Sequence, residues 1–178
     1  MEVFAGFIVG FDNDPPNIFQ RQIDFIQKSG IITAMVGLLN APRLSKLYRR
    51  LENEGRITDE FTGDNTDYSM NFVPVMDKEE LMKGYREIIK SIYSGKAYYT
   101  RVLLFLKQYD PPFTQPLSMN RFMALIKSIL YLGVLTKNRI YFWKIVFWSI
   151  FNKPKSFPLA VTYSIYGYHF RRVFRDVI

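Results

Sequence analysis

The chain of 178 residues contains no cysteine and only one histidine, His169. Without cysteine it can form no disulfide, and it has no thiolate to act as a nucleophile or to bind zinc or an iron–sulfur cluster. One histidine also excludes a metal site built from several histidines. The basic start of a signal peptide is missing, because Glu2, Asp12 and Asp14 lie there instead. We therefore expect a cytoplasmic chain.

Acidic residues are scarce in the second half of the chain. Residues 1–90 hold 11 Lys and Arg against 14 Asp and Glu, whereas residues 91–178 hold 13 against two. The whole chain is rich in aromatic residues, with 16 Phe, 12 Tyr and 2 Trp. This change in charge along the chain indicates two functional halves, and the basic half is also the aromatic one.

The first 55 residues predict a βαβα unit. Two apolar runs without alternation, typical of parallel strands covered on both faces, span residues 3–10 and 31–39. An amphipathic helix follows each run, the first ending near Ser29 and the second spanning residues 44–53. Two strands are too few for an independent α/β sheet. We therefore expect the first strand to lie at the edge where a larger sheet has been cut off.

Local signals set the expected helix boundaries. Asp14 is predicted to cap the first helix, with Pro15 at its first position, and Gly30 to end it. Asp77 begins a capping box with Glu80. The helices expected after this point span residues 77–93, 96–108, 118–132, 138–152 and 158 to near the end.

The expected fold class is therefore α+β and mostly α. The predicted regions are a βαβα unit (1–55), an irregular junction (56–76) and a helical domain (77–178). An acidic cluster in the junction is consistent with a solvated loop and does not match the calcium-loop spacing; its residues are Asp59, Glu60, Asp64 and Asp67. We expect no metal site in this chain.

Several stretches resemble radical SAM enzymes of the group that carries an N-terminal cobalamin-binding domain. Residues 6–12 (Gly-Phe-Ile-Val-Gly-Phe-Asp) resemble a late strand of the partial (β/α)₆ barrel, and residues 35–42 (Met-Val-Gly-Leu-Leu-Asn-Ala-Pro) resemble its last strand and loop. Residues 19–27 also match this group. Residues 56–178, including 166–170 (Tyr-Gly-Tyr-His-Phe), resemble its C-terminal domain of unknown function.

The resemblance implies S-adenosylmethionine, a [4Fe–4S] cluster and cobalamin as cofactors of the full-length family. This chain departs from the family because it lacks the three cluster cysteines and the cobalamin domain. We therefore expect no cofactor in this chain by itself, no catalytic residues and no activity of the chain alone. Its expected partner is the missing N-terminal part of its own protein.

The resemblance also assigns residues to a vestigial wall beside the adenine of S-adenosylmethionine: Gly6, Ile8, Val9, Gly10 and Leu39. Glycine lets the backbone approach a ligand closely, and an apolar side chain can flank a purine. The alternative is that the glycines only allow close packing of helices on the sheet.

One segment near the end of the chain is the best candidate for contact with a substrate or partner: Tyr166, Tyr168, His169, Arg171 and Arg172. His169 is either a general acid or base or a hydrogen-bonded packing residue. Gly167 within a helical pattern indicates a close helix contact or a kink.

Residues 140–151 are apolar nearly all round but too short to span a bilayer. They predict either a buried helix of a bundle or a surface for a lipophilic substrate or for an anionic membrane on the inner face. Basic aromatic sequence also permits RNA binding, which we rate lower because the aromatic residues fall at core spacing. Exposed strand edges further permit homodimerisation.

These observations favour an accessory C-terminal region of a radical SAM enzyme. In this interpretation the chain completes the barrel wall and covers or positions the substrate. The alternatives are a helical module that binds lipid or a membrane surface and a basic RNA-binding module.

Overall fold

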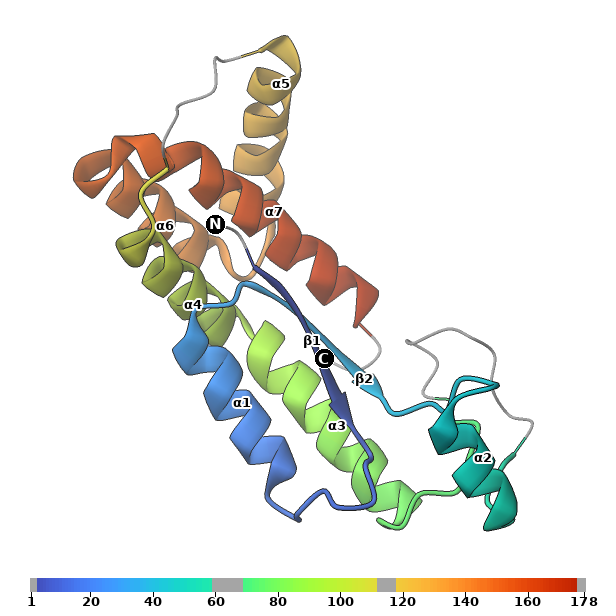
Figure 1. Ribbon diagram of the computed structural model, residues 1–178. Helices are drawn as coiled ribbons and strands as arrows, with labels where there is room; N and C mark the ends of the chain where they lie inside the picture. Colours follow the sequence, from blue (N-terminus) through green and yellow to red (C-terminus); the bar gives the residue numbers. More distant parts are fainter. Residues whose placement is uncertain (1–2, 59–68, 112–117, 176–178) are drawn as a thin grey trace.

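The computed structural model describes residues 3–58, 69–111 and 118–175 (Figure 1). Two parallel strands, β1 (Phe4–Val9) and β2 (Thr33–Leu38), pair with Phe4 opposite Thr33 and Val9 opposite Leu38. The helices around them are α1 (Ile18–Ser29), α2 (Lys46–Asn53), α3 (Lys78–Tyr93), α4 (Gly95–Gln108), α5 (Met119–Ser128), α6 (Arg139–Asn152) and α7 (Phe157–Val173). A π-helix, η1 (Ile129–Leu135), follows α5, and a 3₁₀ turn, η2 (Pro154–Ser156), precedes α7. The predicted class, α+β and mostly α, is confirmed.

The start of α1 differs from the prediction. The helix begins at Ile18 with Asn17 as its N-cap, and the Asp14 carboxylate accepts the backbone N–H groups of Gly10 (2.8 Å) and Phe11 (3.0 Å) instead. Two prolines after Asp14 explain the difference, because a proline at the second helical position has no N–H to give to a capping carboxylate.

Two other predicted boundaries are confirmed. Gly30 ends α1 in the left-handed conformation (φ 70°), and the Asp77 carboxylate accepts the N–H groups of Glu79 and Glu80 at the start of α3. The predicted acidic cluster from Asp59 to Asp67 lies outside the described residues.

The helix expected over residues 118–132 changes form partway. At Ile129 the α-helix gives way to the π-helix η1, which lies close against α6. The indole N–H of Trp143 donates to the carbonyl of Gly133 at 2.9 Å, and a Cβ on Gly133 would lie 3.0 Å from the Trp143 ring. Glycine at this position therefore lets η1 approach α6 closely.

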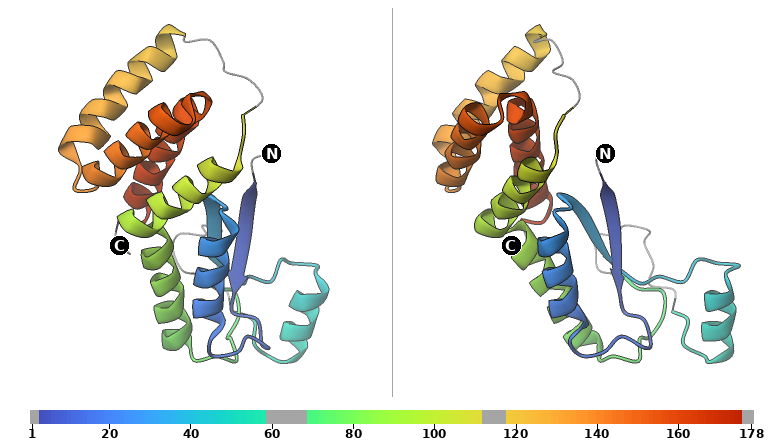
Figure 2. Two further views of the ribbon diagram at one scale, coloured as in Figure 1. Left: turned by 90° about the vertical axis from the view of Figure 1, so that its left-hand side faces the viewer. Right: turned by 60° about the vertical axis from the view of Figure 1, so that its left-hand side comes forward.

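Helices cover one face of the sheet and leave the other open. Figure 2 shows α1 and α3 together on one side of the strands. On the opposite face, Phe4, Ile8 and Met35 are 64%, 47% and 61% exposed. Within the described residues the α layer is therefore on one side of the sheet, where a parallel sheet ordinarily has helices on both.

The core continues from the sheet into the helical part. Helix α3 packs on α1 and β2, and its last turn leads directly into α4, which packs on α6 and α7. Gly167 of α7 allows one of these contacts, because a Cβ there would lie 2.3 Å from the Tyr98 ring of α4. The division into a βαβα unit and a helical domain stays a prediction.

Candidate functional site

The open face of the sheet is an apolar surface with two gaps in it. In the parallel register Gly6 lies beside Met35, and Ile8 lies beside Gly37, so each glycine neighbours a larger apolar side chain. A Cβ built on Gly6 or Gly37 would meet no atom within 4 Å. The two glycines thus leave room for a flat group to lie against the backbone between Ile8 and Met35.

The outer edge of β2 is closed by side chains. The hydroxyls of Tyr93 and Tyr85 donate to the carbonyls of Ala34 (2.7 Å) and Val36 (3.2 Å), which point away from β1. Further along the edge, the Arg101 guanidinium donates to the carbonyl of Ile32 at 3.4 Å. These side chains bond the backbone carbonyls that a further strand would use as acceptors. The outer edge of β2 is therefore protected against pairing with another strand.

The outer edge of β1 is different. The Val9 carbonyl accepts the N–H of Leu39 (2.8 Å), so the alternate residues Phe4, Gly6 and Ile8 direct their backbone groups away from β2. Of these, the Ile8 carbonyl accepts the Gln22 side chain at 2.9 Å. Within the described parts of the chain no bond to the outward groups of Phe4 and Gly6 is found, so this edge can take another strand.

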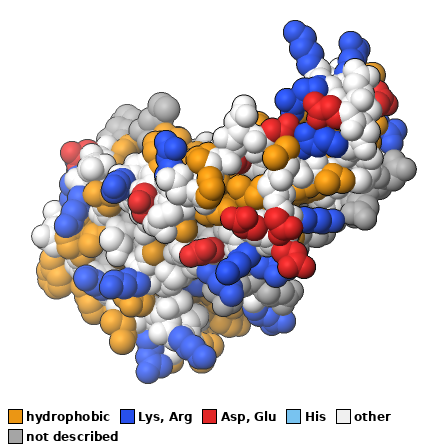
Figure 3. Space-filling model, turned by 90° about the horizontal axis from the view of Figure 1, so that it is seen from below, with side chains coloured by type: hydrophobic (Ala, Val, Ile, Leu, Met, Phe, Trp, Pro, Cys, Tyr) orange, Lys and Arg blue, Asp and Glu red, His pale blue; other side chains and the backbone are white. Residues whose placement is uncertain are grey.

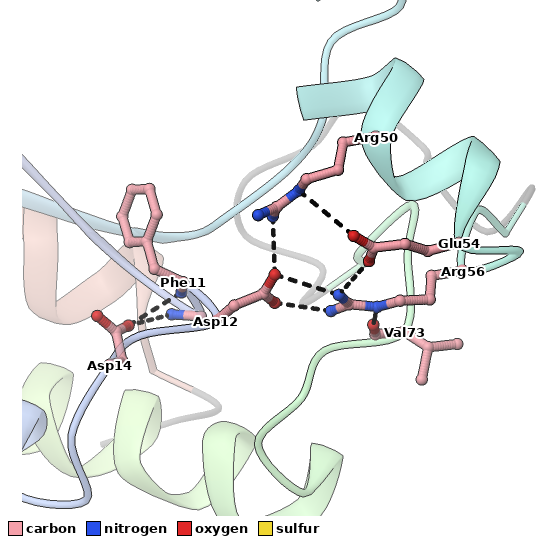
Figure 4. A network of polar contacts seen from close by, with 8 residues as sticks. Phe11, Asp12, Asp14, Arg50, Glu54, Arg56 and Val73 are labelled. Carbon is pink, nitrogen blue, oxygen red and sulfur yellow. Dashed lines mark hydrogen bonds and ion pairs between the residues drawn. The ribbon is translucent and has the colours of Figure 1, made fainter. Parts of the chain in front are cut away.

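Ion pairs hold the loop at the carboxyl end of β1 (Figure 4). The Asp12 carboxylate bonds Arg56 through both oxygens (2.7 and 3.1 Å) and Arg50 through one (2.7 Å). Arg56 also donates to Glu54 at 2.8 Å and to the Val73 carbonyl at 2.8 Å. The hydrogen bond from Arg56 lowers the pKa of Asp12, and the same bond raises the pKa of Arg56. This network ties the β1 loop to α2 and to the following segment.

A pocket of about 410 Å³ opens at the carboxyl end of β2, between the residues that follow the strand and the start of α2. Asn71 forms its floor and is fixed there, because its amide oxygen accepts the N–H of Ala41 (2.8 Å) and its amide nitrogen donates to the Ala41 carbonyl (2.6 Å). Arg43, Tyr48 and Thr58 line the rest together with Asn40 and Pro42. Figure 3 views the molecule from this end. Apolar side chains, in orange, lie between the larger part of the molecule and the smaller part that carries α2. Ligands of open parallel sheets bind at this end of the strands.

The structure separates the five residues predicted to line the adenine. Gly6 and Ile8 lie on the open face, and Val9 lies on the helix-covered face of β1. Leu39, just after β2, is buried. Gly10 (φ 105°) forms the turn after β1, where a Cβ would lie 3.3 Å from the Leu81 side chain. Gly6 and Ile8 are therefore the members of the set that a ligand on the open face can reach.

Sequence reasoning passed over the open-face residues contributed by β2. Met35 and Gly37 belong to the same surface as Gly6 and Ile8, but the register of β1 against β2 is needed to see it. The alternation within each strand was a usable signal, since every second residue faces the same side.

The predicted contact residues near the chain end lie on two sides of α7. Tyr166, His169 and Arg172 are exposed on one side of the helix. Arg171 lies on the other side, with its guanidinium carbon 5.8 and 5.7 Å from the ring centres of Tyr98 and Tyr99. Tyr168 is half-buried against the core. The five residues do not form one cluster.

No group of three or more potential metal-binding side chains occurs among the residues that the structure describes. Within the same residues, no helix has the length and apolar character needed to cross a bilayer.

The fold and the site define a mostly helical protein around a two-stranded parallel sheet, in which side chains bond the outward carbonyls of β2 and β1 has the more open edge. Residues 45–178 match the family described as a domain of unknown function, DUF4070, and the chain belongs to this family. The predicted resemblance to a C-terminal domain of unknown function is thereby confirmed.

Two curated relatives carry methyltransferase names. A Synechocystis sp. protein described as an uncharacterized methyltransferase is 28% identical over 98% of this chain and 33% of its own length. The hopanoid C-2 methylase of Rhodopseudomonas palustris is 28% identical over 81% of this chain and 28% of its own length. The chain thus spans about a third of the relatives it matches. No solved structure matches it.

Proposed function

We propose that this chain acts as the accessory C-terminal region of a larger radical SAM methyltransferase. The relatives with methyltransferase names and their threefold greater length support this role. The observation that carries the proposal is the difference between the two sheet edges. An edge strand with unbonded backbone groups, next to a face without helices, is the surface on which further strands would add.

The neighbouring strand, in this proposal, pairs with the outer edge of β1. Phe4 and Gly6 supply the unbonded backbone groups for that pairing. The side chains that close the outer edge of β2 support the same direction of growth, because they leave β1 as the edge for continuation.

The open face supports a place for the adenine of S-adenosylmethionine. The gaps at Gly6 and Gly37 fit a planar purine, and Ile8 and Met35 can flank it. When bound, this cofactor would supply the transferred group or the radical that starts the reaction. An iron–sulfur cluster does not fit this chain, which has no cysteine, so the rest of the protein would hold it.

The helical part, α3 to α7, would cover or position the substrate. Helix α3 joins the sheet directly to α4, so a substrate held against the helices would be fixed relative to the open face. The name hopanoid C-2 methylase, carried by one relative, favours a lipophilic substrate for this chain's parent protein.

A chimera tests the proposal. In it, this chain replaces the matching region of the Synechocystis relative, and binding of S-adenosylmethionine is measured by equilibrium dialysis. We expect binding in the chimera and none tighter than millimolar in the chain alone. Gly6→Leu should weaken binding at least tenfold, because the side chain fills the gap.

Phe4→Leu is the matched control, since Phe4 lies on the same face at the amino end of β1, away from the end where ligands bind. Equal binding by the Gly6→Leu and Phe4→Leu chimeras would contradict the adenine assignment. Tight binding by the chain alone would contradict the accessory role.

A further inference from the structure

Helix α5 carries its apolar stripe on the side turned away from the protein. Met119, Phe122, Met123 and Ile126 follow the i, i+3, i+4, i+7 spacing of one helix face and are 45 to 74% exposed. Leu130, in the first turn of η1, is 52% exposed. A surface helix ordinarily turns such a stripe toward the core.

The opposite side of α5 and η1 makes the contact with the rest of the molecule. That side consists of the half-buried Leu125 and the buried Ser128 and Leu132. The hydroxyl of Ser128 donates to the Leu125 carbonyl within the helix, at 2.8 Å. The orientation of α5 is thus set by its contact side, and its apolar stripe is left without a partner among the described residues.

Helix α6 repeats this arrangement. Phe142, Ile145, Val146 and Ser149 are buried on one side, and on the other side an exposed stripe contains Ile140 (73%), Phe147 (51%) and Phe151 (80%). One face of α6 is therefore the buried helix face that the sequence predicted, and the use of its exposed face for a lipophilic substrate or a membrane stays a prediction. We call residues 118–152 the α5–α6 hairpin.

The hairpin carries positive charge only. It contains Arg121, Lys127, Lys137, Arg139 and Lys144 and no Asp or Glu. Lys144 lies within the exposed stripe of α6. A partner that covers the two stripes must therefore offer apolar contact together with negative charge, which is the chemistry of an anionic lipid surface.

The position of the hairpin also favours a membrane over a strand added to the sheet. α5 and α6 lie at the end of the molecule away from the carboxyl ends of the strands, and α5 projects from the rest (Figures 1 and 2). Strand β1 lies below them in the body of the molecule. Since no described helix is long enough to cross a bilayer, the contact is with the surface.

We propose that the α5–α6 hairpin docks this protein on anionic membranes, with the apolar stripes of α5 and α6 entering the interface and the basic side chains meeting lipid headgroups. This inference does not depend on the proposed role in a methyltransferase.

Co-sedimentation of the full chain with vesicles tests the proposal. The vesicles are phosphatidylcholine alone or with a third of phosphatidylglycerol, each at 50 mM and 500 mM salt. We expect binding to the anionic vesicles at low salt and at least tenfold weaker binding at high salt, because salt screens the attraction between the basic side chains and the anionic headgroups.

Two variants separate the hairpin from the rest of the surface. Phe122→Ser with Ile126→Ser removes apolar side chains from the α5 stripe and should reduce binding at least tenfold. Val73→Ser with Val75→Ser is the matched control, because these valines are 55% and 67% exposed outside the hairpin, and it should bind as the native chain does.

Tryptophan fluorescence gives a second measurement. Trp143 and Trp148 both lie in α6, half-buried, so brominated lipids should quench their emission when the hairpin enters the interface. Quenching in the native chain and its loss in the α5 variant would support the proposal.

Three results would overturn it. The first is no sedimentation with anionic vesicles at low salt. The second is equal binding by the α5 variant and the control, which would place any lipid contact elsewhere. The third is a chain that does not bind vesicles but binds single-stranded RNA, or that self-associates unless the α5 stripe is changed. Either result would show that RNA or a second copy of the chain covers the stripes instead.

Discussion

The two edges of the sheet are built in opposite ways. At the edge of β2, three buried side chains, Tyr85, Tyr93 and Arg101, reach the outward carbonyls. At the edge of β1, the half-buried Gln22 of α1 is the one side chain among the described residues that reaches an outward carbonyl, that of Ile8. Buried backbone carbonyls without a partner are costly, so a protein closes the edge it will bury and can leave open the edge it will extend.

The closed edge uses costly groups. Arg101 is fully buried, and burial lowers the pKa of its guanidinium. Among the described residues no carboxylate pairs with it; it bonds Gln27 and the carbonyls of Ile92 (3.0 Å) and Ile32 (3.4 Å) and lies over the Tyr98 ring at 5.4 Å. Carbonyl dipoles and an aromatic ring thus replace a counter-ion.

Replacing Arg101 should have the largest effect on stability. Arg101→Ala leaves a cavity and removes the donor to the Ile32 and Ile92 carbonyls, so we expect a loss of about 3 to 5 kcal/mol in the free energy of unfolding. Urea denaturation followed by circular dichroism measures it. Arg172→Ala, at an exposed position of α7, is the control and should change stability by less than about 0.5 kcal/mol. Equal effects of the two variants would contradict the role given to Arg101.

A pair of variants compares the two edges directly. Tyr93→Phe removes one hydroxyl and leaves the buried Ala34 carbonyl without its donor, which should cost about 1 to 2 kcal/mol. Gln22→Ala removes the donor to the Ile8 carbonyl, which solvent can replace, so we expect a change below about 0.5 kcal/mol. The same urea titrations measure both, and a larger loss for Gln22→Ala would reverse the comparison.

The ion pairs beyond β1 should contribute less. Asp12→Asn removes the carboxylate that binds Arg56 and Arg50 and should cost about 1 kcal/mol at pH 7, since the pairs are partly exposed and screened. The pKa of Asp12 is lowered in the folded chain, so its contribution is complete above the ordinary value of 3.8 and is lost as the pH falls through the lowered pKa.

The pH profile of the Asp12 variant therefore has a definite sign. The stability difference between the native chain and Asp12→Asn should be constant from pH 7 to about 5 and should shrink below pH 4. Thermal unfolding in low-salt buffers at each pH measures it. A difference that grows toward low pH would show that the carboxylate is not stabilised by its partners.

The sequence was sufficient for the strands and for most helices of the fold, while the adenine role given to Gly6 and Ile8 stays a prediction. Apolar runs, Gly30 and Asp77 give the strands and two helix boundaries correctly because these signals are local. The prediction that Asp14 caps α1 was wrong. Its carboxylate can accept N–H groups either from the helix or from the preceding turn, and Pro16 has no N–H to give to a cap. Local signals cannot decide between such uses.

The closure of β2 was not predictable from the sequence. Tyr85, Tyr93 and Arg101 have the spacing of core residues, and nothing local shows that their polar tips meet carbonyls about 50 to 70 residues away in the chain. The outward stripe of α5 was missed for the same reason. Its period indicates an amphipathic helix, but only the packing of Leu125, Ser128 and Leu132 shows which side faces the protein.

The open edge of β1 should reveal itself in self-association rather than in stability. Because the edge of β1 is open, we expect the chain to form dimers through it, in a concentration-dependent way measured by sedimentation equilibrium. Gly6→Pro removes an outward N–H without breaking the pairing with β2, so stability should change by less than about 0.5 kcal/mol while dimers are lost. Gly6→Ala keeps the N–H and should dimerise as the native chain does, because its Cβ meets no atom within 4 Å.

Dimers that persist in Gly6→Pro but disappear in the Phe122→Ser, Ile126→Ser variant would place the association on the α5–α6 hairpin. A native chain that stays monomeric at every concentration would show that Gln22 already protects the edge of β1 from pairing. The two edges would then differ in their hydrogen bonds but not in their effect on assembly.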